Sequence, residues 1–361
     1  MISIHQKSST RGRPCFRASV IVVNHNGGDT IVPCLDSIER AADDTVEIIV
    51  VDNASADGSM EQVVELFPSV TCIRSIENLG FGGGNNLGAR YAEGEYLVFA
   101  NPDTIVTPGW WEALVEALAA DPAIGMVTSR ILLIDDPERL NTAGNDVHLT
   151  GLTLCRGMGR PAGEYDVPAV VSAVSGAAFA IRRDLFQQLC GFDEGFFLYM
   201  EETDLSWRAQ LAGFECQYVP ASRVYHHYRL RFGPNKTFYQ ERNRYRMLVK
   251  NLRWRTLFLL SPALLLAEIV TWGYVLVGDR HNWKGKIRAY GSLWADWPNI
   301  MQLRREIQSQ RTVLDKQLME RVTAELDFAQ TGEGLAATLA GWIFTPLFRI
   351  WRRFVLGVMR W

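Results

Sequence analysis

The stretch Ala18-Ser-Val-Ile-Val-Val-Asn-His-Asn-Gly27 decides the fold. Residues 18–23 are mostly apolar and rich in β-branched side chains, which is typical of a strand buried on both faces in a parallel sheet. Polar residues follow at once, and an apolar stripe after them indicates a helix. A second apolar strand, 47–51, then ends in Asp52-Asn53. This order of strand, helix and strand predicts a parallel sheet covered by helices.

The same alternation continues along the chain. A third strand over 70–75 leads into a glycine-rich turn over 78–84, and a fourth strand over 96–100 leads into Asn101-Pro-Asp103. Polar residues therefore gather at the carboxyl ends of the strands, which is where open α/β sheets bind ligands. The sequence predicts a doubly wound α/β domain that binds a nucleotide-type ligand.

Composition narrows the class of protein. The 361 residues are 48% hydrophobic and 21% charged, with a net charge of −3, which excludes disordered, collagen-like and coiled-coil proteins and argues against a nucleic-acid binder. The six cysteines form no C-x-x-C pair, which excludes zinc-ribbon and thioredoxin-type motifs. Residues 1–17 are polar and basic without the apolar segment of a signal peptide, so we expect a flexible N-terminus and a cytoplasmic protein.

The C-terminal third differs in character. We expect the α/β domain over 18–250 and a mostly helical, membrane-associating region over 251–361. Residues 257–277 are apolar and long enough to span a bilayer, but they contain Pro262 and Glu268, so a span and an interfacial or buried helix both stay open. The tail is rich in arginine and tryptophan, which suits an anionic membrane surface.

Several motifs have more than one interpretation. Gly80-Phe-Gly-Gly-Gly-Asn85 lacks the spacing of a dinucleotide fingerprint, and indicates either a tight turn or close approach of the backbone to a ligand. Asp52 suits a hydrogen bond to a base or ribose, or an ordinary turn. Asp103, with Asn101, suits a hard cation such as Mg²⁺ or Mn²⁺, or again a turn.

The run Glu201-Glu202-Thr203-Asp204 is expected to open a helix, where acidic residues favour the N-terminus. Asp204 and Arg208 are spaced to form an ion pair, whereas Glu202 points about 100° away. In a partly apolar setting, Glu202 would have a raised pKa and suit the role of general base. The pair His226-His227 indicates either structural histidines or a metal site.

Taken together, these motifs resemble glycosyltransferase family 2, and within it the rhamnosyltransferase-like branch. The resemblance covers about residues 18 to 250. The matching stretches are Val20–Gly27, Val51–Ser59, Asn78–Asn86, Asn101–Asp103, Ser175–Ala177, Gly191–Glu194, Phe197–Leu205 and Arg242–Arg244.

The resemblance implies a GT-A fold, a Rossmann-like domain with a doubly wound mixed sheet, which binds a nucleoside-diphosphate sugar linked to dTDP or UDP. Asn24 and Asp52 would contact the pyrimidine and ribose. The positions implied around the donor are Asn24, Asp52, Asn78, Gly80, Gly83 and Asn101. The residues implied to bind the metal are Asp103 and His226. The residue implied as the catalytic base is Glu202. The residues implied in acceptor binding or support are Glu201, Asp204 and Arg242.

Two departures from the family pattern matter. The metal motif is often Asp-x-Asp, but its first member here is Asn101, which implies weaker metal binding. The acidic motif usually reads Glu-Asp-x-Asp, and Glu202 replaces its Asp, which moves the carboxylate by about one methylene.

The expected function is inverting transfer of a sugar, L-rhamnose from dTDP-rhamnose, to a hydroxyl of a saccharide or lipid-linked saccharide in cell-surface polysaccharide synthesis. We expect this at the cytoplasmic face of the inner membrane, with peripheral attachment or one weak membrane helix. Two alternatives stay open: a nucleotidyltransferase that makes a sugar-nucleotide, and a non-catalytic membrane scaffold that binds one.

Overall fold

The computed structural model describes residues 3–5, 16–228, 235–278, 280–327, 330 and 335–361. It divides into two compact units, each assembled from more than one stretch of chain. The first unit comprises Met1–Gly144, Cys155–Ala209 and Phe214–Arg229. The second comprises Asn145–Leu154, Gln210–Gly213 and Leu230–Trp361.

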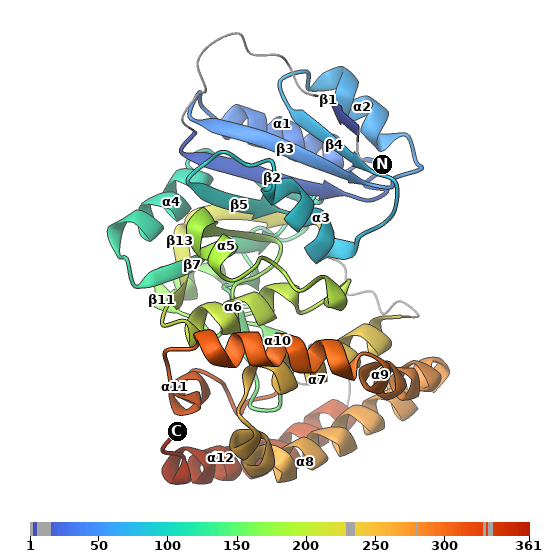
Figure 1. Ribbon diagram of the computed structural model, residues 1–361, viewed down its shortest axis with the longest axis vertical. Helices are drawn as coiled ribbons and strands as arrows, with labels where there is room; N and C mark the ends of the chain where they lie inside the picture. Colours follow the sequence, from blue (N-terminus) through green and yellow to red (C-terminus); the bar gives the residue numbers. More distant parts are fainter. Residues whose placement is uncertain (1–2, 6–15, 229–234, 279, 328–329, 331–334) are drawn as a thin grey trace. The chain divides into compact units, whose positions relative to one another are not determined.

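A mixed β-sheet forms the centre of the first unit (Figure 1). Its strands are β1 (Ser3–His5), β2 (Ala18–Asn24), β3 (Val46–Asn53), β4 (Thr71–Ser75), β5 (Tyr96–Ala100), β6 (Thr104–Val106), β7 (Ile124–Leu133), β8 (Leu140–Thr142), β11 (Ala169–Val170), β12 (Ala178–Arg182) and β13 (Glu215–His226). The order is β1-β4-β3-β2-β5-β12-β7-β13-β11, with β6 on β13 and β8 on β7. Strands β9 (Asn145–Val147) and β10 (Thr153–Cys155) form a separate ribbon.

The parallel half of the sheet follows the pattern expected from the sequence. Strands β4, β3, β2 and β5 run parallel. The chain moves from β2 outward to β3 and β4, and returns to the other side of β2 for β5. The strand order therefore reverses between β2 and β5, and such a switch point is where open α/β sheets bind ligands. The predicted GT-A class of mixed sheet followed by a helical region is confirmed.

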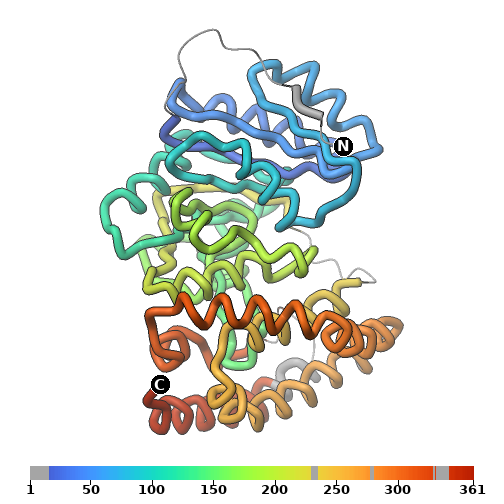
Figure 2. The backbone as a smooth tube through the Cα atoms, viewed as in Figure 1, coloured from blue at the N-terminus to red at the C-terminus, as the bar shows by residue number. Residues whose placement is uncertain are grey.

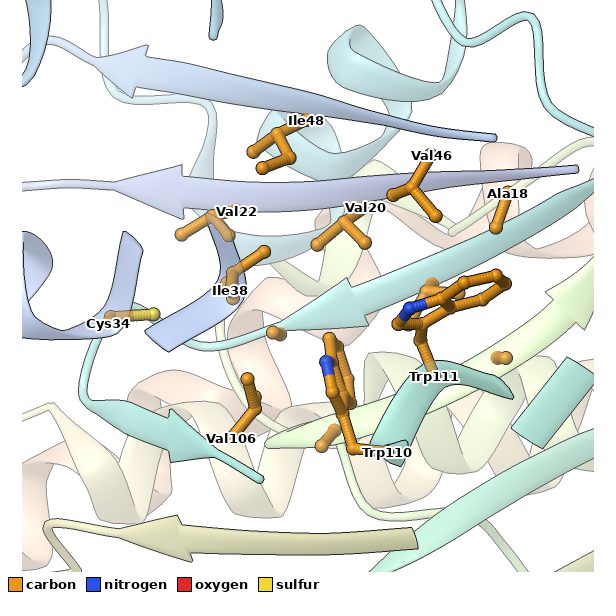
Figure 3. Packing of buried hydrophobic residues seen from close by; sticks show 14 of the residues in the cluster. Ala18, Val20, Val22, Cys34, Ile38, Val46, Ile48, Val106, Trp110 and Trp111 are labelled. Carbon is orange, nitrogen blue, oxygen red and sulfur yellow. The ribbon is translucent and has the colours of Figure 1, made fainter. Parts of the chain in front are cut away.

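Helices cover this sheet. They are α1 (Ile31–Ala41), α2 (Ser59–Leu66), α3 (Gly80–Ala89), α4 (Trp110–Ala120), α5 (Arg183–Gln188) and α6 (Glu201–Leu211). Figure 3 shows the indoles of Trp110 and Trp111 beside Val20 of β2. Both indoles are almost fully buried, and Trp111 Nε1 donates to the carbonyl of Ala41 at 3.0 Å. Helix α4 is thereby tied both to the sheet and to the end of α1.

The other half makes the sheet mixed, as predicted, but strand β7 was not expected from the sequence. Strand β12 pairs antiparallel with β5 and β7, and β7 pairs parallel with the long β13. Strand β7 is buried along almost its whole length, yet it contains Thr128, Ser129 and Arg130, which obscure an apolar strand signal. Their polar groups find partners on other strands: Thr128 donates to the Ala178 carbonyl at 3.0 Å, and Arg130 Nε donates to Tyr218 Oη at 3.1 Å.

The predicted glycine-rich turn over 78–84 is wrong in extent, because α3 already begins at Gly80. Glycine is needed here for close packing of the helix on the sheet. A β-carbon on Gly84 would lie 2.7 Å from Cγ1 of Val23. The small residues therefore bring the α3 backbone directly against β2.

The second unit is mainly helical. Its helices are α7 (Lys236–Asn251), α8 (Trp254–Gly278), α9 (Trp283–Ala295), α10 (Trp297–Gln310), α11 (Asp315–Glu320) and α12 (Leu335–Val358). Helix α7 packs against α9 and α10, and α8 packs against α12 (Figure 2). Within the described residues, Trp254–Leu276 is long and apolar enough to cross a membrane, and 22% of its most apolar window is buried.

A buried ionic cluster joins α7, α8 and α9. Arg244 Nη2 contacts Glu241 Oε1 at 2.5 Å and Glu268 Oε1 at 2.6 Å. Lys286 Nζ lies 3.3 Å from Glu241 and 3.2 Å from Glu268, and Tyr290 Oη donates to Glu268 Oε2 at 2.6 Å. Burial alone would raise the pKa of Glu268, but its hydrogen bonds and the charge of Arg244 lower it. Glu268, the acidic residue inside the apolar stretch 257–277, is therefore paired within the second unit.

Candidate active site

Asn24 ends the central strand β2 and is fully buried. Its Nδ2 donates to Ser59 Oγ at 2.9 Å and to Ser55 Oγ at 3.2 Å, while its Oδ1 accepts from the Gly27 amide at 3.1 Å. The side chain thus holds together the loops that follow β2 and β3. This fixes the shape of the sheet edge where the base and ribose of a nucleotide are expected.

Asp52 lies beside Asn24 in the sheet register and is 6% exposed. Its Oδ1 accepts from the Ser55 amide at 2.9 Å, and its Oδ2 lies 3.9 Å from Arg74 Nε. One oxygen therefore shapes the turn after β3, as the ordinary interpretation of an aspartate at a strand end expects. The other oxygen, Oδ2, faces the guanidinium of Arg74 on β4.

Asn53, which was not among the residues predicted for the site, organises the start of α3. Its Nδ2 donates to Asn78 Oδ1 and to the Gly80 carbonyl, both at 3.0 Å, and its Oδ1 accepts from the Leu79 amide at 2.8 Å. Asn78 Oδ1 also accepts from the Gly80 amide at 2.9 Å. Asn53 thereby ties the end of β3 to the predicted donor residues Asn78 and Gly80, and its place at a polar strand end was the available signal.

Gly80 and Gly83 have different packing needs. Gly80 has φ +72°, and a β-carbon there would lie 2.1 Å from the carbonyl oxygen of Phe197. At Gly83 a β-carbon would lie 2.8 Å from Cβ of Leu79. Substitution is therefore hindered at both positions, and at Gly80 the obstacle is the backbone of the loop that precedes α6.

Asp103, the residue just before β6, lies beside His226 at the end of β13. The Nε2 atom of His226 lies 3.3 Å from Asp103 Oδ1, and the His227 amide donates to the Asp103 carbonyl at 3.0 Å. Strand β6 pairs with the end of β13, opposing Thr104 to His226. The carboxylate and the imidazole predicted for the metal are therefore neighbours.

Glu202 is a half-buried residue in the first turn of α6. Burial of its carboxyl raises the pKa to about 7, and the hydrogen bond from Thr203 Oγ1, at 3.4 Å, opposes that rise only in part. Such a carboxyl exchanges protons near neutral pH, as a general base requires.

A single loop links Glu202 with the metal motif. A β-carbon on Gly176 would lie 3.5 Å from Cδ of Glu202 and 3.6 Å from its Oε2, so the carboxyl packs on this glycine. The next residue, Ala177, accepts a hydrogen bond from the Asn101 amide at 2.9 Å. The segment 176–177 therefore contacts both Glu202 and the start of Asn101-Pro-Asp103.

The other acidic residues of α6, Glu201 and Asp204, are both buried, and their expected role in acceptor binding or support stays a prediction. Asp204 is fully buried and pairs with Arg208 at 2.8 Å, which confirms the ion pair expected from their spacing. Arg208 also donates to the carbonyls of Leu189 and Gly191, at 2.5 and 2.7 Å. Glu201 is only 1% exposed. These residues fix the helix whose first turn presents Glu202.

Arg242 lies on α7, in the second unit. Its guanidinium lies 5.2 Å from the ring centres of both Phe238 and Tyr239, and its Nε donates to Asn243 Oδ1 at 2.9 Å. Its expected role in acceptor binding or support stays a prediction.

The residues at Asp103 fit a divalent cation. Among the residues that the structure describes, Asp103 Oδ1 is buried without a hydrogen-bond partner, although the imidazole lies beside it. Within the described residues no group of three or more His, Cys, Asp and Glu side chains is placed to hold a metal. Mg²⁺ is commonly held by one or two carboxylates together with substrate phosphates, so a pair of protein ligands suffices.

Comparison with known proteins shows what this chain is similar to. Residues 19–190 match the family model described as glycosyl transferase family 2. An N-acetylglucosaminyl-diphospho-decaprenol L-rhamnosyltransferase of Mycobacterium tuberculosis is 28% identical over 235 residues, which are 58% of this chain and 75% of that protein. The rhamnosyltransferase WbbL of Escherichia coli is 26% identical over 222 residues, 58% of this chain and 82% of that protein. The resemblance inferred from the motifs is confirmed.

Solved structures share the fold. GalNAc-T7, crystallised with UDP, GalNAc and Mn²⁺, matches 65% of this chain and 48% of that chain, with a TM-score of 0.56 and 22% identity. Residues 1–349 of Staphylococcus aureus TarS, in complex with UDP-GlcNAc, match 95% of this chain and 91% of that chain, with a TM-score of 0.54 and 15% identity.

Proposed function

We propose that this chain, which carries a glycosyl transferase family 2 domain, inverts the anomeric carbon of a nucleoside-diphosphate sugar as it transfers that sugar to an acceptor hydroxyl. The observation that carries the proposal is the shared loop at 176–177. It contacts the carboxyl of Glu202 at Gly176, and its Ala177 carbonyl accepts from the amide of Asn101, which leads to Asp103. A base and a diphosphate site at one loop are what a single displacement requires.

Glu202 would act as the base. Its carboxylate accepts the proton of the acceptor hydroxyl while the acceptor oxygen forms a bond to the anomeric carbon. The bond from that carbon to the diphosphate oxygen breaks, and its electron pair leaves with the nucleoside diphosphate. A pKa of about 7 suits this role, because the carboxylate is both available and basic near neutral pH.

Asp103 and His226 would hold a divalent cation, Mg²⁺ or Mn²⁺, at the donor diphosphate. When bound, such an ion neutralises the charge that develops on the leaving group. Asp103 Oδ1 has no hydrogen-bond partner in the described ranges of the chain, and this supports the assignment. Asn101 in place of an acidic residue leaves the site with fewer anionic ligands, so we expect weaker metal binding than in members with two acids.

The donor is proposed to be dTDP-L-rhamnose. The names of the two bacterial rhamnosyltransferases support rhamnose as the sugar. Asn24, Asp52 and Asn101 would frame the nucleotide, since they stand at or just after the ends of neighbouring strands β2, β3 and β5. Asn78, Gly80 and Gly83, at the start of α3, would line the diphosphate and sugar.

The acceptor is proposed to be a saccharide on a lipid diphosphate, so that the enzyme works at a membrane in cell-surface polysaccharide synthesis. Helix α8 supports membrane contact. Four large apolar side chains on it are 59–82% exposed and recur at intervals of seven or four residues: Phe258, Leu265, Ile269 and Leu276. Those intervals place them on one face of the helix.

The opposite face of α8 is occupied within the second unit. Leu260, Ala263 and Ala267 on that face are almost fully buried. Trp351 on α12 donates to the Leu259 carbonyl at 3.2 Å, and Glu268 belongs to the buried ionic cluster. A helix with one packed face and one exposed apolar face suits the plane of a membrane surface better than a span across it.

Helix α12 has the same two-sided character. The large apolar side chains on its described part that are 45–76% exposed are Trp342, Ile343, Leu347, Ile350, Phe354 and Val358. Residues 335–361 contain four arginines and no acidic residue. Such a surface suits the anionic cytoplasmic leaflet of the inner membrane, to which we propose the enzyme binds peripherally.

The test is a two-step assay on the purified full chain. Thermal stabilisation by dTDP-rhamnose, UDP-GlcNAc and GDP-mannose, with and without Mn²⁺, first identifies the donor. Transfer to a lipid-diphosphate N-acetylglucosamine acceptor is then measured. We expect stabilisation by dTDP-rhamnose, and a product of inverted configuration. Pyrophosphate release from a nucleoside triphosphate with a sugar phosphate would instead identify a nucleotidyltransferase, and binding without any turnover would identify a scaffold.

A further inference from the structure

The side chain that contacts the far nitrogen of His226 belongs to Asn141. Asn141 is 2% exposed, and its Oδ1 lies 2.9 Å from His226 Nδ1. It stands on the short strand β8, which pairs with β7, and β7 in turn pairs with the part of β13 that ends in His226. No motif of the sequence singled out this residue.

A bulge directs Asn141 towards the histidine. In the β7–β8 pairing, Thr142 opposes Ile131 and Leu140 opposes Leu132, so Asn141 is the extra residue on β8. Bulges of this kind re-aim a side chain and recur next to active sites. The contact therefore arises from a local feature of the sheet at this position.

The contact determines where the imidazole carries its proton. An amide oxygen only accepts hydrogen bonds, so Nδ1 must be the protonated nitrogen of a neutral ring. The lone pair of Nε2 then faces Asp103 Oδ1 at 3.3 Å, and this carboxylate oxygen makes no hydrogen bond within the described part of the chain. Two acceptor atoms that face each other without a proton between them are suited to share a cation.

The separation of these atoms is compatible with that role. Two adjacent ligands of an octahedral Mg²⁺, each at 2.0–2.1 Å, lie about 3 Å apart. In metal sites generally, the second nitrogen of a ligating histidine donates to an oxygen that fixes the ring and its tautomer.

We propose that Asn141 is a positioning residue that holds His226 in the Nδ1-protonated tautomer, so that Nε2 and Asp103 Oδ1 together bind the divalent cation. This inference rests on the proposed metal-dependent transfer. It adds a residue that touches neither substrate nor cation, and acts through the imidazole alone.

The first experiment determines the tautomer without metal or substrate. Nitrogen-15 labelled histidine spectra of the metal-free full chain distinguish protonated from bare ring nitrogens, and the spectrum of His226→Gln identifies the signal of His226 among the six histidines. We expect Nδ1 protonated and Nε2 bare in the wild type and in Asn141→Asp, which keeps an acceptor. In Asn141→Leu we expect a mixture of the two tautomers.

The second experiment measures Mn²⁺ binding in the presence of dTDP by calorimetry. Asn141→Leu should weaken Mn²⁺ binding about 10- to 100-fold, the usual effect of losing an outer partner of a metal ligand, and Asn141→Asp should restore it. The matched control is Thr142→Val on the same buried strand, which removes a hydrogen bond to the Gly144 carbonyl but leaves Asn141 in place. The control should bind Mn²⁺ as the wild type does.

Two results would overturn the inference: a wild-type His226 protonated on Nε2, or a folded Asn141→Leu with unchanged Mn²⁺ affinity. The wild-type spectrum decides the first point even if Asn141→Leu does not fold. If instead the wild type binds no Mn²⁺ at all, the proposed metal dependence fails while the tautomer result still stands by itself.

Discussion

The carbonyl oxygen of Phe197 fills the space beside Gly80 in which any other residue would place its β-carbon. The Phe81 amide donates to this oxygen at 2.8 Å. Phe197 itself has a positive φ of +64°, which is uncommon outside glycine, and Tyr199 and Met200 just before α6 also have positive φ. The start of α3, in the proposed donor site, is therefore joined to the loop that sets the position of Glu202.

Gly80→Ala should separate these two segments. A β-carbon 2.1 Å from a backbone oxygen forces the loop to move, in addition to the cost of about 1 kcal/mol for a left-handed alanine. We expect the free energy of unfolding to fall by roughly 2 kcal/mol or more, and kcat to fall with it. The control is Gly109→Ala, with φ +82° and open space around it. Equal losses in the two variants, measured by urea unfolding, would contradict the proposed contact.

Glu202→Gln should lower kcat while donor binding persists. Removal of a general base usually costs 10²–10⁴-fold, and the amide cannot accept the acceptor proton. Glu116→Gln, on an exposed part of α4, is the matched control and should leave kcat unchanged. Near-normal turnover by Glu202→Gln would end the assignment of the base.

The pH profile gives a separate check on Glu202. The base must be ionised to work, so wild-type kcat/KM should fall about tenfold per pH unit below a pKa of about 7. An acidic limb that instead has its midpoint near 4.5, the ordinary value for a glutamate, would show that burial does not raise this pKa.

Stability should depend on pH through the same residue. Between pH 4.5 and 7 the folded protein holds the Glu202 proton more tightly than the unfolded chain does, so the free energy of unfolding falls as the pH rises through this window. Above pH 7 the buried carboxylate should cost at most about 3 kcal/mol. Glu202→Gln should therefore be more stable than the wild type at pH 8 and no more stable at pH 4.5, as urea unfolding at the two pH values can show.

Asp103→Ala should remove both turnover and the response to added Mn²⁺. The substitution takes away the carboxylate that would hold the cation at the leaving diphosphate. The measurement is the rate of transfer across a Mn²⁺ titration, with EDTA as the zero point. Wild-type activity that survives in EDTA would contradict metal dependence.

The exposed face of α8 should govern binding to vesicles. Phe258→Glu combined with Ile269→Glu places charges on side chains that are 82% and 62% exposed, so the fold should persist. Loss of two large apolar contacts should weaken binding to anionic vesicles by at least about tenfold. Ile76→Glu, 75% exposed in the first unit, is the matched control. Unchanged flotation of the double variant would contradict this surface.

Local patterns account for what could be predicted. The strands of the parallel half are apolar on both faces, and the ion pair between Asp204 and Arg208 follows from helical spacing alone, so both were visible in the sequence. Strand β7 was not visible, because its buried polar residues are satisfied by partners on distant strands.

The same distinction holds at the site. Asp103, Glu202 and His226 belong to short motifs, whereas the contact between Asn141 and His226 depends on a bulge and on two strand pairings. No local signal marks such a residue. Likewise, the glycines at the start of α3 were visible as a group in the sequence. Only the structure shows that they form the surface by which α3 packs on β2.

The two units are built from alternating stretches of the chain, and this affects how chimaeric proteins can be designed. Two segments of the helical unit, Asn145–Leu154 and Gln210–Gly213, lie in the sequence between segments of the first unit. If one region of the chain were exchanged at a single junction, each unit would therefore lack a segment that belongs to it. Chimaeras that join a foreign helical region to the first unit should therefore need all the junctions redesigned together, unlike proteins whose domains follow one another along the chain.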